Sequence, residues 1–266
     1  MGADGGPASS LETARKPEPP HGVRRTRLRR LAIVVAAVAA ALAVIVVTAG
    51  GGSSPPRPGG PHAITTARAV SALLAGVPQR ANTLGQPAAR VTLRWYGDLE
   101  CPFCKEFALG ALPSIVRRWV RGGQLKIEYL SLETATREPK VFQAQQVAAL
   151  AAGTQDKMWN FIETFYREQG EESSGYVTER YLRGIAGQIP GLNVALWSED
   201  RHDPRLAAQV LAEGLAATRA RFSGTPTFLI GVSGTTLKRF RPGTLTDPRP
   251  YEEAIEYLLR GRGTIA

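Results

Sequence analysis

Two cysteines are the residues of this chain whose type and spacing point most directly to chemistry. The 266-residue sequence contains only Cys101 and Cys104, in the run Cys101-Pro102-Phe103-Cys104. Chains that use disulfides as structural staples carry more cysteines at wider spacing. A thiol at the start of a helix lies against free backbone N–H groups and the positive end of the helix dipole, which both favour its thiolate. Because a stabilised reduced form makes the disulfide more oxidising, the pair predicts redox chemistry.

Two other interpretations of the cysteine pair are weaker. A structural zinc site needs about four ligands, but there is no second cysteine pair, and His21, His62 and His202 are isolated in the sequence. A purely structural disulfide across so short a loop would remove little entropy from the unfolded chain. Pro102 suits the first turn of a helix, where its missing N–H costs nothing. The sequence therefore favours a catalytic dithiol and predicts neither a metal nor a cofactor.

The segments around the cysteines predict elements that would position them. Residues 91–96 are rich in β-branched and aromatic residues and predict a strand, and residues 125–130 predict a second one. Between them, Pro113 should kink a helix that Gly122-Gly123 ends. A strand, helix and strand at this spacing predict parallel pairing with a right-handed crossover. Apolar residues recur on one face of that helix at Ala108, Leu112, Ile115, Val116 and Trp119.

The chain after residue 130 alternates helical and strand patterns. Strand character returns at 227–232, and Ser233-Gly234 predicts a turn to a hairpin partner at 237–240. The chain should close with a helix at 251–259. Strands therefore flank an all-helical stretch, which indicates the α/β class. The helices expected in that stretch cover 139–152, 155–169, 177–187 and 204–221.

The N-terminal region predicts a membrane anchor. Residues 1–30 are rich in Gly, Pro, Ser and charge and predict a disordered tail. Residues 31–49 contain no charged side chain and would span about 28 Å as a helix, close to the thickness of a bilayer's hydrocarbon core. Five arginines precede this run between positions 24 and 30, whereas only Arg57 lies soon after it. That asymmetry predicts a cytoplasmic N-terminus and an extracytoplasmic remainder.

A cleaved signal peptide is the alternative for the apolar run, since Val47-Thr48-Ala49 fits a small-residue cleavage site. Both interpretations export the rest of the chain. Residues 50–62 then predict a flexible linker, followed by a short lead-in helix near 64–77. The net charge of +10 does not indicate a nucleic-acid partner, because the basic residues outside the tail are dispersed and form no recognisable nucleic-acid module.

Taken together, the motifs resemble the DsbA-like family of thioredoxin-fold disulfide oxidoreductases, in particular its membrane-anchored Gram-positive type. The resemblance covers about residues 80–262 and implies a thioredoxin fold with an inserted all-helical subdomain, preceded by a single N-terminal transmembrane helix. The motifs are Leu84-Gly85, Val91-Thr92-Leu93, the run from Asp98 to Phe107, Ala148 to Gly153, Asp156 to Trp159, and Gly224 to Phe228. The expected segments are a cytoplasmic tail (1–30), a transmembrane helix (31–49), a linker and lead-in helix (50–80), the first part of the thioredoxin fold (81–134), the helical insertion (135–222) and the second part of the fold (223–266).

The resemblance also implies roles for individual residues. Cys101 would be the nucleophile and Cys104 the resolving thiol, while Pro226 would be a cis-proline facing them. The substrate-binding wall would consist of Pro102, Phe103, Thr225 and Pro226. Phe103 departs from the best-known members of the family, which have His at that position. Because Phe103 carries no positive charge, the redox potential of the pair stays open.

The expected function is that of an extracytoplasmic thiol–disulfide oxidoreductase that introduces disulfides into exported proteins. Its clients would be exported cysteine-containing proteins, and a quinone-linked membrane partner would reoxidise it. The expected location is the cell membrane, with a single pass. Two alternatives stay open: a disulfide reductase or isomerase of the same fold, and a non-catalytic membrane-tethered module that binds peptides.

Overall fold

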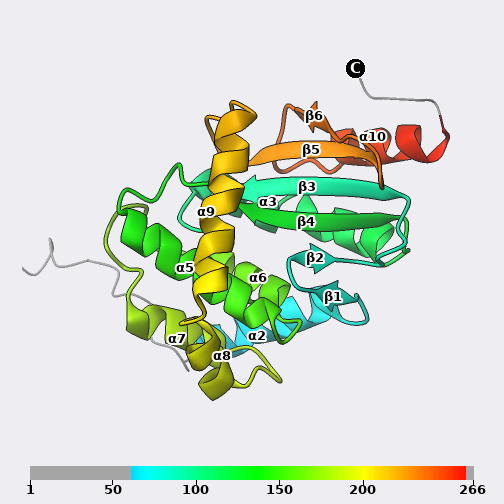
Figure 1. Cartoon of the computed structure of the whole chain (residues 1–266). Coiled ribbons are helices and arrows are strands. Elements are labelled where there is room, and N and C mark those ends of the chain that lie inside the picture. The colour runs from blue at the N-terminus through cyan, green and yellow to red at the C-terminus, as the bar shows by residue number, and fades with distance from the viewer. Residues whose placement is uncertain (1–60, 262–266) are drawn as a thin grey trace, which may run out of the picture. The chain divides into compact units, whose positions relative to one another are not determined.

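A six-stranded mixed sheet forms the centre of the part of the chain that the computed structural model describes, residues 61–261 (Figure 1). Its strand order is β1-β2-β4-β3-β5-β6. The central strand β3 pairs in parallel with β4 and antiparallel with β5. This mixed α/β arrangement is a thioredoxin-like fold, as expected, and the parallel pairing that the cysteine-bearing crossover predicts is confirmed. The strands are β1 Gln79–Arg80, β2 Thr83–Leu84, β3 Val91–Gly97, β4 Leu125–Ser131, β5 Thr227–Val232 and β6 Lys238–Phe240.

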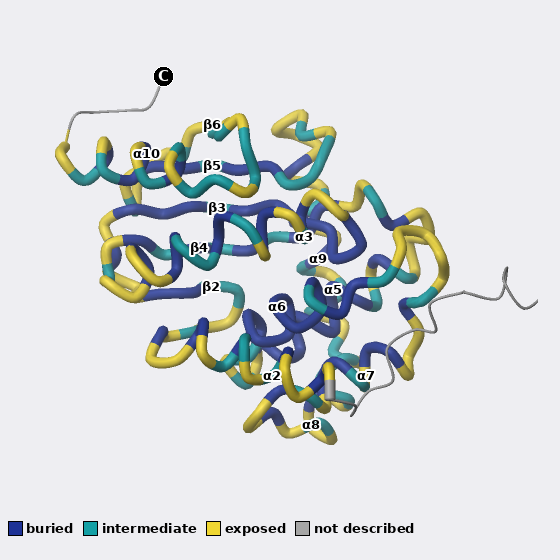
Figure 2. Tube along the Cα trace, turned by 180° about the vertical axis from the view of Figure 1, so that it is seen from behind, coloured by how far each residue is buried: buried dark blue, intermediate teal, exposed yellow. Residues whose placement is uncertain are grey.

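Strand β3 is buried along almost its whole length because helices cover both faces of the sheet (Figure 2). Trp95 points to one face, where it meets Phe107 of helix α3 (Pro102–Leu109) and Tyr166 of helix α6 (Met158–Glu168). Its neighbour Tyr96 points to the opposite face, in a small cluster with Ala217 of helix α9 (Pro204–Arg219). The C-terminal end of β3, which the cysteines follow, is therefore held by packed side chains on both faces of the sheet.

The crossover helix is interrupted, as Pro113 predicts. Helix α3 ends at Leu109, helix α4 covers Leu112–Ile115 with Pro113 in its first turn, and a π-helical segment η1 follows at Val116–Val120. Proline lacks an N–H, and its ring crowds the carbonyl four residues earlier, which disfavours a continuous helix here. Gly110 fills the break, where a Cβ would lie only 2.7 Å from Thr246 Cα of a crossing segment. All five apolar residues of the expected helix face are buried.

Five helices connect β4 to β5, and the four that the sequence predicts there are confirmed within a few residues at their ends. The fifth, α8, was not predicted. It has seven residues, and the side chain of Asn193 starts it by accepting from the N–H groups of Ala195 and Leu196. Helix α9 crosses in front of the ends of β3 and β4 (Figure 1). The other three helices of this stretch are α5 Pro139–Gly153, α7 Glu179–Gly187 and α8 Val194–Asp200.

Helix α2 (Pro61–Leu74) confirms the expected lead-in helix, although it begins and ends three residues earlier than expected. It packs against α6, where the hydroxyl of Thr66 donates to Glu168 at 2.6 Å. Helix α10 (Arg249–Leu259) confirms the expected final helix. The predicted tail (1–30), transmembrane helix (31–49) and most of the linker lie outside the described residues. Within residues 61–261, no helix is long and apolar enough to cross a membrane.

Candidate active site

The two cysteines lie at the start of helix α3, directly after the C-terminal end of β3. Cys101 occupies the position before the first helical residue, with extended backbone angles (φ −70°, ψ 119°), and its side chain makes no capping hydrogen bond. Its N–H donates to the carbonyl of Asp98 at 3.0 Å, which forms the turn into the helix. Both cysteines are free thiols; Cys104 is fully buried and Cys101 is 3% exposed. The helix N-terminus therefore supplies N–H groups that the Cys101 sulfur can use.

The two thiols have opposite shifts in pKa. A hydrogen bond from the Cys104 thiol does most to lower the pKa of Cys101, to about 7, against the effect of burial. Hydrogen bonds from Thr225 and from the N–H groups of Cys104 and Phe103 add to this lowering. Burial, and then the neighbouring Cys101, raise the pKa of Cys104 well above its ordinary value. The thiolate is therefore more favoured at Cys101 than in a free cysteine, whereas Cys104 stays a thiol at neutral pH.

The loop before β5 faces the Cys101 sulfur. The Thr225–Pro226 peptide bond is cis, as the resemblance implies, and the Cys101 Sγ donates to the carbonyl of Thr225 at 3.4 Å. Pro102 and Phe103 belong to the same corner of the molecule but project outward, and Phe103 is 58% exposed. The structure thus brings Cys101, Cys104 and Thr225 together and leaves Phe103 facing solvent.

Asp98 is a buried carboxylate behind this corner that sequence reasoning did not single out. Its Oδ2 accepts from three successive backbone N–H groups, those of residues 134–136, at 2.8–3.0 Å. Its Oδ1 accepts from the N–H of Glu100 at 3.1 Å, the hydroxyl of Thr136 at 2.6 Å and the amide of Gln145 at 3.4 Å. Buried carboxylates are tolerated when several donors satisfy them. Asp98 therefore ties the segment before the cysteines to the loop after β4.

Gln169, at the end of α6, holds the same segment from the other side. Its Nε2 donates to the carbonyl of Leu99 at 2.6 Å and to that of Cys101 at 3.2 Å. No local sequence pattern indicates this contact, because Gln169 lies 68 residues from Cys101 along the chain. The resemblance could have drawn attention to Asp98, which belongs to its central motif, but nothing marked Gln169.

Comparison with known proteins agrees with this geometry. A family model described as "Thioredoxin" matches residues 79–238, which is more than half of the chain. This chain belongs to the thioredoxin family. Among its relatives, a probable disulfide bond formation protein D of Bacillus anthracis is 22% identical over 149 residues, covering 56% of this chain and 68% of the relative. The disulfide bond formation protein D of Bacillus subtilis is 25% identical over 184 residues, covering 67% and 77%.

Solved structures show the same fold. The oxidised crystal structure of BdbD from Bacillus subtilis aligns with a TM-score of 0.58 and 23% identity, covering 71% of this chain and 98% of that one. The crystal structure of α-DsbA1 from Wolbachia pipientis aligns with a TM-score of 0.57 and 15% identity, covering 68% and 91%. Within the thioredoxin family, this chain is therefore similar to disulfide bond formation proteins in sequence and to DsbA structures in fold.

Two charged residues beside the cysteines of this thioredoxin-family chain, Lys105 and Glu100, have partners outside the cysteine pair. The amine of Lys105 donates to the carbonyl of Gln169 at 3.2 Å. Glu100 is buried, and that burial raises the pKa of its carboxyl, while hydrogen bonds from Thr136 and the backbone of Ser173 oppose the rise. Both side chains therefore help to close the helical stretch against the cysteine segment.

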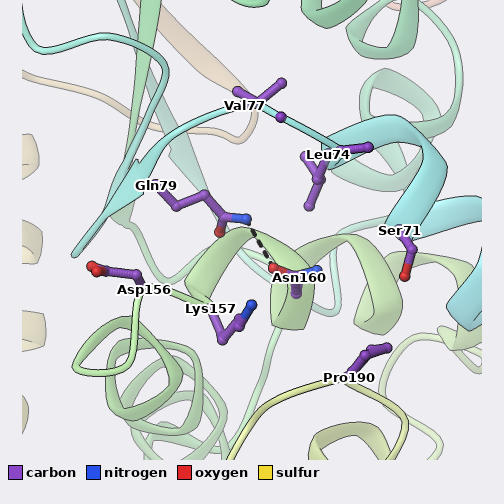
Figure 3. A pocket seen from close by; sticks show the side chains of 10 residues that line it. Ser71, Leu74, Val77, Gln79, Asp156, Lys157, Asn160 and Pro190 are labelled. Carbon is purple, nitrogen blue, oxygen red and sulfur yellow. Dashed lines mark hydrogen bonds between the residues drawn. The ribbon is translucent and has the colours of Figure 1, made fainter.

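A polar cavity of about 360 Å³ lies near α2 and α6 (Figure 3). Gln79 and Asn160 meet in it, with the amide of Gln79 donating to Asn160 Oδ1 at 2.8 Å. Neither cysteine lines this cavity. Within residues 61–261, no group of three or more His, Cys, Asp or Glu side chains could hold a metal ion.

Proposed function

We propose that the chain is an extracytoplasmic thiol–disulfide oxidoreductase that introduces disulfides into exported proteins through Cys101 and Cys104. The observation that carries the proposal is the difference between the two thiols. Cys101 stands at a helix start with its pKa lowered to about 7, whereas Cys104 is fully buried with its pKa raised. With this difference, the Cys101 sulfur leaves readily as a thiolate, whereas the Cys104 sulfur stays protonated in the reduced pair.

The reaction starts from the oxidised protein, with a Cys101–Cys104 disulfide. A client thiolate attacks the Cys101 sulfur, so that a mixed disulfide forms and Cys104 leaves and takes up a proton. A second thiolate of the client then attacks the client sulfur of this mixed disulfide. Cys101 leaves as a thiolate, because its low pKa makes it a good leaving group. The client loses two electrons and gains a disulfide, and the cysteine pair is reduced.

Pro226 and Thr225 provide the surface for the client in this proposal. The carbonyl of Thr225 lies 3.4 Å from the Cys101 sulfur in the dithiol form, so a client chain bound beside Pro226 would place its own sulfur within reach of Cys101. Pro102 and the exposed Phe103 border the same place. Reoxidation needs an electron acceptor, and we propose a quinone-linked membrane partner for it. The names of the relatives, which are disulfide bond formation proteins, support this direction of electron flow.

Two substitutions test the assignment of roles. Cys101→Ser should abolish oxidation of a reduced model protein that contains several cysteines, because Cys104 alone cannot form the intramolecular disulfide that the client attacks. Cys104→Ser should also fail to oxidise the reduced client, but its Cys101 thiolate should attack a disulfide of the oxidised client, form a mixed disulfide and release one client thiolate. That mixed disulfide should persist, since no resolving thiol is present to release the client. Non-reducing gels distinguish the two results. Wild-type oxidation by the Cys101→Ser protein would contradict the proposal.

A disulfide reductase or isomerase is a second candidate, and one observation favours it. Phe103, between the two cysteines, adds no positive charge that would stabilise the Cys101 thiolate. A less stabilised thiolate makes the disulfide less oxidising. A non-catalytic peptide-binding module agrees less well with the structure, because it needs no lowering of the pKa of Cys101.

A further inference from the structure

Two threonine hydroxyls from different loops meet beside the Cys101 sulfur. Thr225 precedes Pro226, and Thr134 follows strand β4. Their Oγ1 atoms lie 2.5 Å apart, although the two residues are 91 positions apart in the sequence. Thr225 also contacts the Cys101 sulfur through its carbonyl, at 3.4 Å. The pair therefore joins the loop after β4 to the loop that faces the cysteine.

Because each hydroxyl has only one hydrogen, it matters which of the two threonines donates in the hydrogen bond between them. A threonine hydroxyl has one hydrogen to donate and two lone pairs that accept. If Thr134 donates to Thr225, the hydrogen of Thr225 is free to point at the Cys101 sulfur. If Thr225 donates to Thr134, the sulfur loses that donor. The orientation of one hydroxyl thus decides whether the thiolate of Cys101 receives this hydrogen bond.

Asp98 fixes the position of Thr134. The Oδ2 of Asp98 accepts the N–H of Thr134 at 3.0 Å and those of the next two residues at 2.8 and 2.9 Å. The Asp98 carbonyl also accepts the N–H of Cys101 at 3.0 Å, so one residue holds both sides of the corner. With the loop held in this way, donation from Thr134 to Thr225 and from Thr225 to a negative sulfur aligns the hydroxyl dipoles, and hydrogen bonds in such a chain strengthen one another.

We propose that Asp98 and Thr134 form a positioning pair that turns the hydroxyl of Thr225 toward the sulfur of Cys101. This inference rests on the proposed disulfide exchange and deepens it. The donors that lower the pKa of Cys101 are neutral ones: the Cys104 thiol, Thr225 and two backbone N–H groups. A hydroxyl held in the right direction supplies part of the thiolate stabilisation that Phe103 does not.

Thr134→Val in the full-length reduced chain tests the pair, because valine keeps the shape of threonine and removes the hydroxyl. The pKa of Cys101 is measured from the pH dependence of its alkylation rate. We expect a rise of about half a unit, which corresponds to about a threefold loss of alkylation rate below pH 6. Thr134→Ser should restore the native value. An unchanged pKa would overturn the proposal, and so would a fall, which would mean that Thr225 donates to Thr134.

Two further variants sharpen the test. Thr227→Val removes a hydroxyl at the start of β5, two residues from Thr225, that donates to the carbonyl of Gly224 at 2.7 Å, so the pKa of Cys101 should not move. An equal shift in this control would show that the effect is not specific to the pair. Asp98→Asn, checked for folding by circular dichroism, should raise the pKa in the same direction as Thr134→Val; a folded variant with the native pKa would remove Asp98 from the pair.

Failure of the proposed function and failure of the positioning pair give different results. If the wild-type chain oxidises no dithiols, the proposed function fails whatever Thr134→Val does. If the wild-type chain is active and Thr134→Val leaves the pKa of Cys101 unchanged, only the positioning pair fails.

Discussion

At the scale of single residues, the site depends on how one sulfur is favoured as a thiolate without a charged neighbour. The hydrogen bond from the Cys104 thiol is the largest contribution, and Thr225 and the helix N–H groups add to it. Burial works in the opposite direction for both cysteines. More than half of the surface of Phe103 is exposed, so packing does not require a phenylalanine at this position. Its position is therefore open to substitution.

Phe103→His should make Cys101 more acidic. In the native chain, the rate of alkylation by iodoacetamide should rise with pH through a midpoint of about 7, because the thiolate is the nucleophile. A protonated imidazole at position 103 would stabilise that thiolate and move the midpoint below the native value. Phe103→Leu, which adds no charge, is the control and should keep the native midpoint. An equal midpoint in the histidine variant would show that residue 103 does not act electrostatically on the sulfur.

At the scale of the elements, helix α6 carries a buried carboxyl that the chemistry does not use. Glu163 is fully buried, and neither of its oxygens has a hydrogen-bond partner. Arg167 is its ion-pair neighbour at 3.5 Å, outside good hydrogen-bond geometry. Burial raises the pKa of Glu163 to about 7, and Arg167 only partly opposes this. The folded chain therefore prefers the neutral acid.

Glu163→Gln should gain stability relative to the native chain as the pH rises. Because the pKa is higher in the folded chain than in the unfolded one, the neutral carboxyl is favourable at low pH and this advantage is lost as the pH rises through about 7. Glutamine does not ionise. Between pH 5.5 and pH 8, the free energy of unfolding of the variant should improve over the native value by about 1–2 kcal/mol. Urea unfolding at the two pH values measures this, and an equal difference at both would contradict it.

Elements with a long repeating pattern could be predicted from the sequence, whereas those that depend on a distant partner could not. The pattern of helix α9 and the β-branched and aromatic composition of strand β3 are both local features of the sequence. Strands β1 and β2 have two residues each; β2 pairs with the edge of β4, as in the pairing of Thr83 with Glu128, and β1 pairs with β2 in turn. The same holds for the site. The spacing of Cys101 and Cys104 is local, but Thr134 and Gln169 reach the site only through the fold.

At the scale of the whole molecule, the proposal that the catalytic domain is exported depends on residues 31–49. The described part itself contains no spanning helix.

Alkaline phosphatase fused after Ala266 of the full chain should be active in bacterial cells, since that enzyme needs an oxidising compartment for its disulfides. Green fluorescent protein fused at the same place should be dark. Replacing the five arginines between positions 24 and 30 by glutamate should weaken this orientation. An inactive alkaline phosphatase fusion, together with a fluorescent green fluorescent protein fusion, would place the domain in the cytoplasm and contradict the proposal.

The central claim is that the pair Cys101 and Cys104 oxidises other proteins, and its reduction potential tests this most directly. Equilibrating the full chain with glutathione buffers and counting free thiols gives the value. Since the pKa of Cys101 is lowered to about 7, the reduced form is stabilised and the disulfide should be oxidising. We predict a potential above about −200 mV, in the range of the oxidising members of the fold. A value near −270 mV, where thioredoxin lies, would contradict the oxidase function and support a reductase.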